Sequence, residues 1–505
     1  MRKGSAYVFR LTAVAADRLE RRLNSHRPVD GLLFESLVPQ ALMLSDLDEA
    51  SHAPQHAWLS YRPGVDGEAA TYLERIRPGS APASLRLQKK SLDCATGGNP
   101  TNPTIVAQFE RSRWTTRAPF QIELRLDRGR IDGSGPTVDY AELLLYTLPH
   151  ETDSATPLPS SRKARSALLV LASHLNRIAP LFVRAETAIQ AELRANTEAL
   201  RPVKHKSAAW PPTEALCRKA LEDVLAHWLA NQDGVRSQCD IEFTHQLRVA
   251  LRRLATALKV FCPQLAADWL AAIEPELRWL RTLLGTARDW DVFVEATVPA
   301  ISADIADLGA AMPAASELTG LRAQAVGEQA LAHDAVVAAL DSPRYASLML
   351  TLLQGVAALA PPHPHLAVPA GLRRRAKRWL RKNDLGGRGL HALVDGTGAT
   401  FRAWPAPRQH KLRLRAKRMR YALEFLAPLL RTGALRRAQR HYVALLDALG
   451  RANDAVVGAR LSQQLPLGDA LQDYAQHSLA ARRQASLRAV ETHLPRLRRA
   501  RLKRV

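Results

Sequence analysis

Two runs of basic residues, each opened by a histidine, are the segments of this chain best suited to chemistry. The stronger run, residues 410–421, reads His-Lys-Leu-Arg-Leu-Arg-Ala-Lys-Arg-Met-Arg-Tyr, and a weaker one begins at His245. Between Arg408 and Arg420 there are seven lysines and arginines, one histidine and no acidic residue. Like charges one helical turn apart repel each other, so this run favours a surface that a polyanion neutralises over a merely solvated face.

Helical spacing gathers these side chains on one face of each predicted helix. At about 100° per residue, the basic positions of each run fall on one side and the apolar positions on the other. The basic faces hold His245, Arg248, Arg252, Arg253 and Lys259 in the first run, and His410, Arg413, Lys417, Arg418, Arg420 and Tyr421 in the second. The apolar faces hold Leu247, Leu251, Leu254, Leu258 and Phe261, and Leu412, Ala416, Met419, Leu423 and Leu426.

These residue types favour phosphate among the anions. A guanidinium group binds phosphate oxygens bidentately, and a lysine supplies a compact positive charge. Phosphate groups nearby favour the protonated form of a histidine, whose ordinary pKa is about 6.5. Binding is therefore expected to strengthen as the pH falls.

The two runs belong to an internal repeat with a constant offset of 165 positions. His245–Arg248 matches His410–Arg413, Arg252-Arg253 matches Lys417-Arg418, and Leu284–Asp289 matches Leu449–Asp454. Two separate blocks that agree on one offset predict two similar helical bundles related by a pseudo-two-fold axis.

The Leu-Gly-x-x-x-Asp block of each repeat is interpreted as a turn. In this interpretation Gly285 and Gly450 end a helix, and Asp289 and Asp454 cap the next one. Arg288 has two open alternatives, since it can join the binding surface or pair with Asp291.

Charge and composition limit the class of protein. The chain has 505 residues and a net charge of +23, and residues 371–505 alone hold 31 basic and 8 acidic side chains. An anionic partner is therefore expected near the C-terminal third. Four cysteines, Cys94, Cys217, Cys239 and Cys262, lie too far apart to predict a disulfide framework or a zinc site. No signal-peptide core and no membrane-spanning segment is recognised, so a cytoplasmic protein is expected.

The remaining pattern predicts an α+β region followed by an all-α region. Alternating residues at 120–126 and 140–146 predict two antiparallel strands of one sheet, the first closed by a turn at Asp127-Arg128-Gly129 and then Gly133-Ser134-Gly135-Pro136. After Thr213 long amphipathic helices predominate. The predicted boundaries are residues 1–200 for the first domain, 201–212 for a linker, and 213–505 for the helical domain, with halves at about 213–365 and 370–505.

The histidine-led helices and the Leu-Gly…Asp blocks over residues 213–505 resemble the CHAD family, the conserved-histidine α-helical domain. The resemblance implies two pseudo-symmetric bundles with a basic cavity between them, inorganic polyphosphate as the partner, and association with polyphosphate granules. It assigns the ligand contacts to His245, Arg248, Arg252, Arg253, His410, Lys411, Arg413, Lys417, Arg418 and Arg420. Tyr421 and Arg288 complete the predicted polyphosphate-binding set.

The region before residue 200 resembles a degenerate CYTH domain, the antiparallel β-barrel-like triphosphate-tunnel fold. This resemblance rests on Asp127-Arg128-Gly129, the strand around Glu142 and the helix that follows. Active members hold metal and triphosphate with a Glu-x-Glu-x-Lys strand, where this chain reads Ala6-Tyr7-Val8-Phe9-Arg10, and Leu144 and Tyr146 stand where further acids are expected. With too few carboxylates for divalent metal, triphosphatase activity is expected to be lost.

The combined prediction is a non-enzymatic polyphosphate-binding protein with no cofactor, no metal and no catalytic residue. A divergent inorganic triphosphatase is the first alternative. A basic protein that binds nucleic acid non-specifically is the second, although the basic faces lack interleaved aromatic residues. The sequence leaves the oligomeric state open, a homo-oligomer included.

Overall fold

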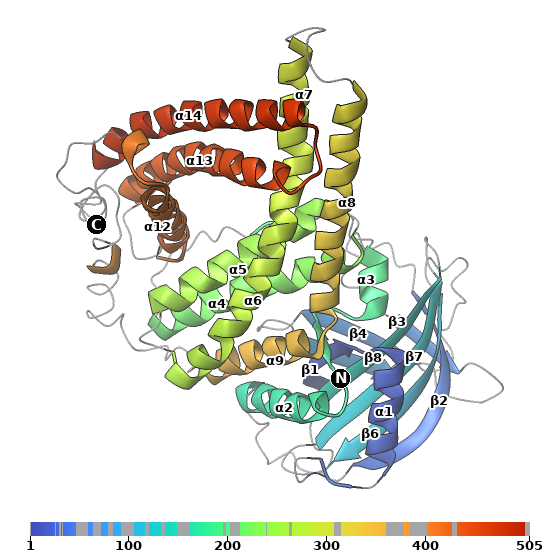
Figure 1. The fold of residues 1–505 in the computed structure, drawn as a ribbon. Helices are drawn as coiled ribbons and strands as arrows, with labels where there is room; N and C mark the ends of the chain where they lie inside the picture. Colours follow the sequence, from blue (N-terminus) through green and yellow to red (C-terminus); the bar gives the residue numbers. More distant parts are fainter. Residues whose placement is uncertain are drawn as a thin grey trace. The chain divides into compact units, whose positions relative to one another are not determined.

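A computed structural model of the chain shows an antiparallel sheet followed by a helical region (Figure 1). By packing, the chain divides into two compact units. Unit 1 comprises Met1–Arg201, Leu225–Phe243 and Ala338–Leu359, and unit 2 comprises Pro202–Val224, Thr244–Val337 and Ala360–Val505. The structure describes residues 2–25, 27–29, 32, 34–46, 59–63, 72–78, 84–91, 106–116, 121–132, 137–148, 161–194, 198–202, 213–238, 240–261, 265–307, 315–359, 378–380, 382, 401–426 and 432–499.

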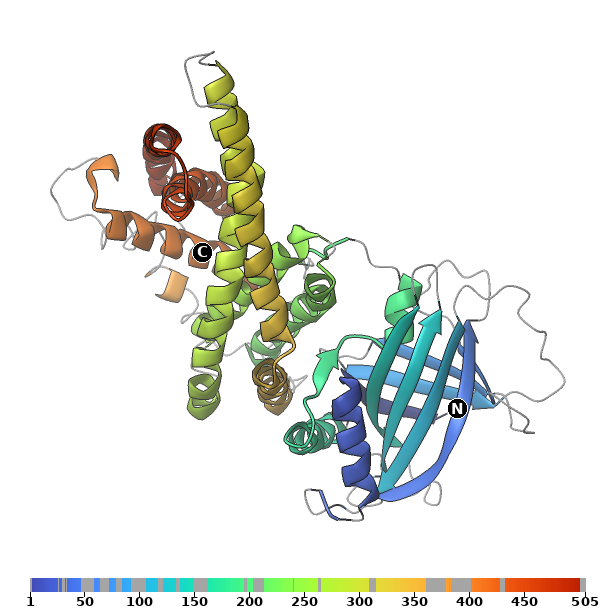
Figure 2. The ribbon, with the colours of Figure 1, turned by 45° about the vertical axis from the view of Figure 1, so that its right-hand side comes forward.

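The described strands of unit 1 form one antiparallel sheet, which Figure 2 shows with its long strands side by side. Its order is β5-β4-β3-β2-β6-β7-β8-β1-β9, and β1 also pairs with β5. The strands are β1 (Arg2–Arg10), β2 (Glu35–Asp46), β3 (Leu59–Pro63), β4 (Tyr72–Pro78), β5 (Ser84–Ser91), β6 (Val106–Thr116), β7 (Gln121–Asp132), β8 (Val138–Leu148) and β9 (Phe182–Arg184).

The two strands predicted from alternation are confirmed as β7 and β8, which pair with each other. The first part of the predicted turn, Asp127-Arg128-Gly129, is wrong, because β7 continues through these residues to Asp132, and the second part, residues 133–136, lies outside the described residues. Asp127 stays in the strand because its buried carboxylate accepts from Arg111 Nε and Nη2, at 2.7 and 2.8 Å. Gly129 fits there because an added Cβ would lie 2.0 Å from the carbonyl oxygen of Gln108 on β6.

Helices of unit 1 pack on this sheet and on each other. Helix α1 (Ala13–Asn24) contacts β8, and α2 (Ser161–Asn176) contacts β1, β8 and α9 (Pro343–Ala358). The predicted apolar positions Leu168, Leu171 and Leu175 of α2 are buried. A short helix, α3 (Ala188–Arg194), follows β9.

A buried polar chain links α9 to the second part of α4 (Thr213–Arg236) within unit 1. Trp228 Nε1 donates to Tyr345 Oη at 2.9 Å, and Tyr345 Oη donates to Gln232 Oε1 at 2.7 Å. Gln232 Nε2 in turn donates to the carbonyl oxygen of Val183 on β9 at 2.7 Å. Burial raises the pKa of Tyr345 to about 12, so its hydroxyl stays a donor at neutral pH. Satisfied buried polar groups of this kind fix one packing arrangement, because leaving any of them unpaired is costly.

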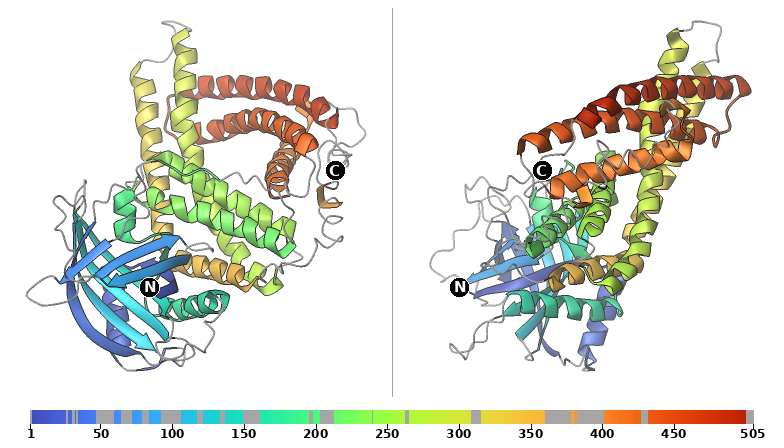
Figure 3. Two further views of the ribbon diagram at one scale, coloured as in Figure 1. Left: turned by 180° about the vertical axis from the view of Figure 1, so that it is seen from behind. Right: turned by 90° about the vertical axis from the view of Figure 1, so that its left-hand side faces the viewer.

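Unit 2 is helical, with the long helices seen from two further directions in Figure 3. A π-turn, η3, joins α6 and α7 into one run, against which α8 packs, and α13 and α14 lie side by side. The helices are α5 (Ile241–Phe261), α6 (Ala267–Val292), η3 (Phe293–Thr297), α7 (Val298–Asp307), α8 (Ala315–Leu340), η4 (Phe401–Ala403), α12 (Ala406–Phe425), α13 (Thr432–Ser462) and α14 (Asp469–Arg499).

The two basic runs are confirmed as the helices α5 and α12, and all ten positions assigned to their apolar faces are buried. Helix bounds follow the repeat, since α12 begins 165 positions after α5 and α13 begins 165 positions after α6. No helix among the described residues is long and apolar enough to cross a membrane. Cys217 is buried, and Cys94, Cys239 and Cys262 lie outside the described residues.

The interpretation of the Leu-Gly blocks as turns is wrong. Gly285 lies inside α6 and Gly450 inside α13, and neither ends a helix. Neither Gly285 nor Gly450 has the positive φ that a left-handed glycine cap requires. Asp289 and Asp454 are accordingly interior helix residues, free to point at something other than a helix end.

Candidate anion-binding site

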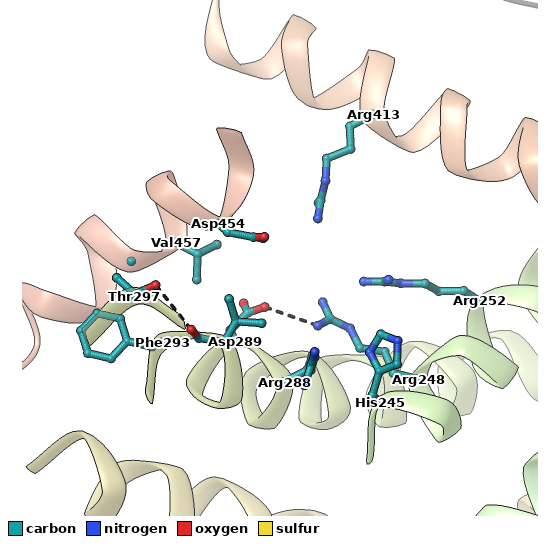
Figure 4. Close-up of a pocket in the computed structure, with 12 residues that line it drawn as sticks. His245, Arg248, Arg252, Arg288, Asp289, Phe293, Thr297, Arg413, Asp454 and Val457 are labelled. Atoms are coloured by element: carbon teal, nitrogen blue, oxygen red, sulfur yellow. Dashed lines mark hydrogen bonds and ion pairs between the residues drawn. The ribbon is translucent and has the colours of Figure 1, made fainter. Parts of the chain in front are cut away.

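A cavity of about 160 Å³ lies within unit 2, where α5, α6 with η3, α12 and α13 converge (Figure 4). Four arginines and one histidine line it, together with two aspartates and a small apolar wall. The lining residues are His245, Arg248, Arg252, Arg288, Asp289, Val292, Phe293, Thr297, Arg413, Asp454, Val457 and Gly458.

Helix α5 contributes the largest share of the basic lining. His245, Arg248 and Arg252 are spaced by three and four residues, so they point from one face of the helix into the cavity (Figure 4). The opposite face is held by the buried leucines Leu247 and Leu251, which fix the rotation of the helix. The weaker of the two sequence runs therefore supplies most of the basic lining.

Helix α12 places Arg413 across the cavity from α5 (Figure 4). Lys417 follows Arg413 by one helical turn and interacts electrostatically with Arg252, Arg413 and Arg248. Arg418 is half-buried and interacts with Arg415 and with Lys259 of α5. Thus Arg413 and Lys417 from the second run meet the basic face of the first, as the repeat predicts.

Other predicted residues of these helices lie outside the cavity lining. His410, Lys411 and Arg420 are exposed on α12, and the Arg420 guanidinium lies 5.8 Å from the ring centre of the buried Tyr421. Arg253 is buried and forms an ion pair with Glu424. The helical wheel placed Arg253 with the ligand contacts because it ignores such tertiary partners.

The two aspartates are functional candidates that the sequence analysis assigned to helix caps. Both face the cavity between its basic and apolar ends, and they occupy equivalent positions of the repeat (Figure 4). Asp289 is 3.5 Å from Arg248 and 3.5 Å from Arg460. The offset of 165 positions relates the two aspartates in the sequence. That offset could have identified them as a pair, because local capping does not explain why both repeats place an aspartate in the same cavity.

A buried cluster of polar side chains around Asp291 holds Arg288 in position. Asp291 is fully buried, and its Oδ1 accepts from His333 Nε2 at 2.7 Å and from Gln329 Nε2 at 3.0 Å. Its second oxygen is 3.6 Å from Arg288 Nη1. Arg288 therefore pairs with Asp291, as one of the two alternatives held, and it also lines the cavity.

The π-turn η3 shapes the apolar wall. Its wider hydrogen-bonding turn brings Phe293 and Thr297 to the cavity, next to Val292 of α6. Helix α13 approaches closely at Gly458, where an added Cβ would lie 3.0 Å from Thr297 Cγ2. π-Turns inside helices often occur at functional sites, and this one sets the end of the cavity.

Burial and mutual repulsion lower the pKa values of the cationic groups. Burial, followed by the neighbouring Arg252, lowers the pKa of Arg248 to about 10. The pKa of Arg413 is lowered by burial and by Arg248, against the opposing effect of Asp454. At an effective dielectric constant of 20, two like charges 4 Å apart repel by about 4 kcal/mol. An anion bound in the cavity would relieve this repulsion.

The pKa of Lys417 is lowered furthest. Burial lowers its pKa to about 6, with further lowering by Arg252, Arg413 and Arg248. The Lys417 amine is therefore largely neutral at pH 7 until an anion favours its charged form. The pKa of His410 is also lowered, first by burial and then by Arg413 and Lys417. Among the described residues no group of three or more His, Cys, Asp or Glu side chains could hold a metal ion.

The region that contains this cavity is similar to known proteins. The model of the CHAD domain family matches residues 219–463, which include all twelve lining residues. The chain is similar to the CHAD domain from the plant Ricinus communis, with 30% identity over 59% of this chain and 96% of that one, and a TM-score of 0.48. It is also similar to PptA from Streptomyces chartreusis, with 20% identity over 57% of this chain and 99% of that one, and a TM-score of 0.40. No curated protein matches it.

The lowered pKa of Lys417 predicts proton uptake on anion binding. Its amine should titrate near pH 6 in the free protein and at higher pH with inorganic phosphate bound, because the anion stabilises the charged form. Labelling with an amine-reactive acetylating reagent across a pH series, read by mass spectrometry, follows this midpoint. The denatured protein serves as the reference.

The same shift has a consequence for stability. The pKa of Lys417 is lower in the folded state than its unfolded value of about 10.4, so the free energy of unfolding should rise with pH between about 6 and 10. A Lys417→Met variant should be more stable than the wild type at pH 7 and should lose this dependence. A variant that is less stable at pH 7 would contradict the assignment.

Proposed function

The chain belongs to the CHAD family, and on that premise we propose that its cationic cavity binds inorganic polyphosphate without chemical turnover. One observation carries the proposal: basic side chains from both repeats, Arg248 and Arg252 on α5 and Arg413 on α12, converge on one cavity. Guanidinium groups that surround a cavity bind several phosphate oxygens at once, and each bidentate contact is charge-assisted.

The remaining basic residues of α12 extend this proposal to a long ligand. His410, Lys411 and Arg420 are exposed, so they are available to a chain that leaves the cavity. Their attraction acts through solvent and is screened at high salt, whereas the half-buried arginines of the cavity are screened less. Polyphosphate binding should therefore weaken with salt but persist at physiological ionic strength.

Charge reversal tests the cavity directly. The double variant Arg248→Glu and Arg252→Glu should weaken polyphosphate binding by at least about 100-fold, because two charge-assisted contacts are lost at about 1.5–3 kcal/mol each. Calorimetric titration at fixed salt measures the change. The matched control is Arg278→Glu with Arg281→Glu, which makes the same change in net charge at two exposed positions of α6. Equal weakening in both variants would refute the cavity as the binding site.

Nucleic acid remains the second candidate partner because the same charges attract any polyanion. The cavity favours polyphosphate, since its guanidinium groups are positioned around a volume of about 160 Å³, too small to admit a duplex. Competition at equal phosphate concentration separates the two. Displacement of polyphosphate by duplex DNA would transfer the proposal to nucleic acid.

We propose further that the chain associates with polyphosphate granules. A fluorescent fusion should form foci in cells that make polyphosphate and should become diffuse in cells that do not. The Arg248→Glu, Arg252→Glu fusion should remain diffuse in both, because it lacks the paired contacts of the cavity. Foci that persist without the polymer would exclude the association.

For unit 1 we propose a degenerate CYTH-like tunnel fold without triphosphatase activity. The pairing of β5 with β1, which joins distant parts of the strand order, supports the fold. Ala6, Val8, Leu144 and Tyr146 are buried in one apolar cluster, and these are the positions where acids were expected. Apolar side chains there supply no oxygen ligand for a divalent metal.

The surviving acid, Glu142, supports the same proposal. Its Oε2 accepts from the backbone N–H of Ala188 at 2.8 Å, so it already has a structural partner. Burial, followed by the nearby Asp127, raises the pKa of Glu142. A carboxyl group that favours its protonated form binds a divalent metal weakly, because metal ligands must be deprotonated.

Triphosphatase activity is accordingly expected to be absent. The purified chain should release no phosphate from triphosphate with magnesium or manganese beyond the level of a buffer blank. Turnover above that level that a Glu142→Gln substitution abolishes would establish the alternative, a divergent triphosphatase. The polyphosphate-binding site in unit 2 would be unaffected by that result.

A further inference from the structure

The two carboxylates in the cavity favour a ligand that can share a proton with them as well as carry negative charge. Asp289 and Asp454 line the same cavity as the arginines, at equivalent positions of the repeat. A carboxylate repels every phosphate oxygen that carries only negative charge. A cavity for fully ionised phosphoryl groups alone would bind them better with neutral residues at both positions.

Pairing with arginine accounts for one of these carboxylates in part. Asp289 lies 3.5 Å from Arg248 and from Arg460, so it contributes to holding Arg248 in place. Asp454 lies near Arg413 and Lys417, yet burial raises its pKa in spite of both. With its raised pKa, Asp454 holds a proton more readily than a surface aspartate does. It can therefore share that proton in a hydrogen bond with another acidic oxygen.

The end of a phosphate chain provides such an oxygen. An internal phosphoryl group carries one negative charge and no hydroxyl at neutral pH. A terminal group carries a second ionisable oxygen, and for phosphate monoesters this second pKa is about 6. Near that pH a terminal P–OH donates a hydrogen bond to a carboxylate, or a protonated carboxyl donates to the terminal oxygen, whereas an internal group can do neither.

The shape of the cavity agrees with a chain end. At the wall beyond the carboxylates, Phe293 is both a lining residue and a member of a buried hydrophobic core cluster, and Val457 packs against that cluster (Figure 4). Thr297 and Gly458 close the same wall by direct approach of η3 and α13. Charged phosphate would not enter the hydrophobic core, so a chain that reaches this wall ends there.

We infer that the cavity binds the terminal phosphoryl group of a linear phosphate chain, with Asp454 and Asp289 hydrogen-bonded to its hydroxyl-bearing end and the arginines holding the groups before it. The volume of about 160 Å³ admits only a few phosphoryl groups, at roughly 10–15 Å³ for each water-sized atom. The inference rests on the proposed binding of polyphosphate. It adds a preference for ends over internal segments.

A ring without ends provides the test. Linear tripolyphosphate and cyclic tetrametaphosphate carry similar charge at pH ~6, where the linear chain retains terminal hydroxyls. Calorimetric titration of the full chain with each ligand should give tighter binding of the linear form by about tenfold, the effect of one hydrogen bond to a charged group. Asp454→Asn should reduce this ratio at least threefold. Asp473→Asn, at an exposed position of α14, should leave the ratio unchanged.

The outcomes separate this inference from the function on which it rests. Equal binding of ring and chain by the wild type overturns end recognition and leaves polyphosphate binding intact. Binding of neither ligand overturns end recognition, and a failure of long-chain polyphosphate to bind as well overturns the proposed function. A ratio that persists in Asp454→Asn and in Asp289→Asn also overturns the role of the carboxylates. Because the wild-type comparison needs no variant, a folding defect in either variant leaves the inference open to refutation.

Discussion

Repulsion among positive charges that water screens poorly is the constraint on which the helical unit depends. Arg248 and Arg252 on α5 and Arg413 on α12 line one cavity, and at an effective dielectric constant of 20 any two like charges 4 Å apart repel by about 4 kcal/mol. The leucines on the opposite face of α5 offset this cost, since each fully buried leucine contributes about 1.5–3 kcal/mol. Burial of the apolar face of α5 therefore keeps its basic face next to other positive charges, an arrangement that an isolated helix in water would not adopt.

The acidic residues around the cavity moderate this repulsion without cancelling it. Asp289 lies beside Arg248, and the buried Asp291 lies beside Arg288. Hydrogen bonds from His333 and Gln329 hold Asp291 in place, and Asp291 in turn positions Arg288. Guanidinium groups held in place before the ligand arrives lose less conformational freedom on binding, and this preorganisation favours affinity. Burial, followed by the neighbouring arginines, still lowers the pKa values of Arg248 and Lys417, so the acids do not cancel the repulsion.

Periodicity and the internal repeat predicted much of this arrangement. The helical wheel identified both faces of α5 and α12, because apolar spacing dictates which side is buried. It did not separate Arg252, which lines the cavity, from its neighbour Arg253, which pairs with Glu424. Adjacent residues differ by only about 100° on a wheel, and the neighbouring helix decides which partner each one meets.

Glycine was the residue whose role was mistaken. Gly285 and Gly450 were assigned to helix ends from local preference, yet both lie inside long helices in open space, where an added Cβ would meet nothing within 4 Å. The cost of a glycine in a helix is about 1 kcal/mol, which the packing of a helix of this length overrides. Because the helices continue through both glycines, Asp289 and Asp454 are not capping residues, and both line the cavity. In unit 1 the continuation of β7 through Asp127 follows the same logic, because its ion pair with Arg111 outweighs a local turn signal.

The two repeats contribute to the cavity in proportions that differ from their charge density in the sequence. The C-terminal run is the more basic, but several of its charges, including Lys411 and Arg420, are exposed. Exposed charges raise the rate of encounter with a polyanion and are screened by salt, whereas partly buried charges determine how long it stays. The fainter run contributes Arg248 and Arg252 to the cavity, and burial lowers the pKa of both. If the cavity binds polyphosphate as proposed, the denser run would attract the ligand over a distance, and the sparser run, together with Arg413, would hold it.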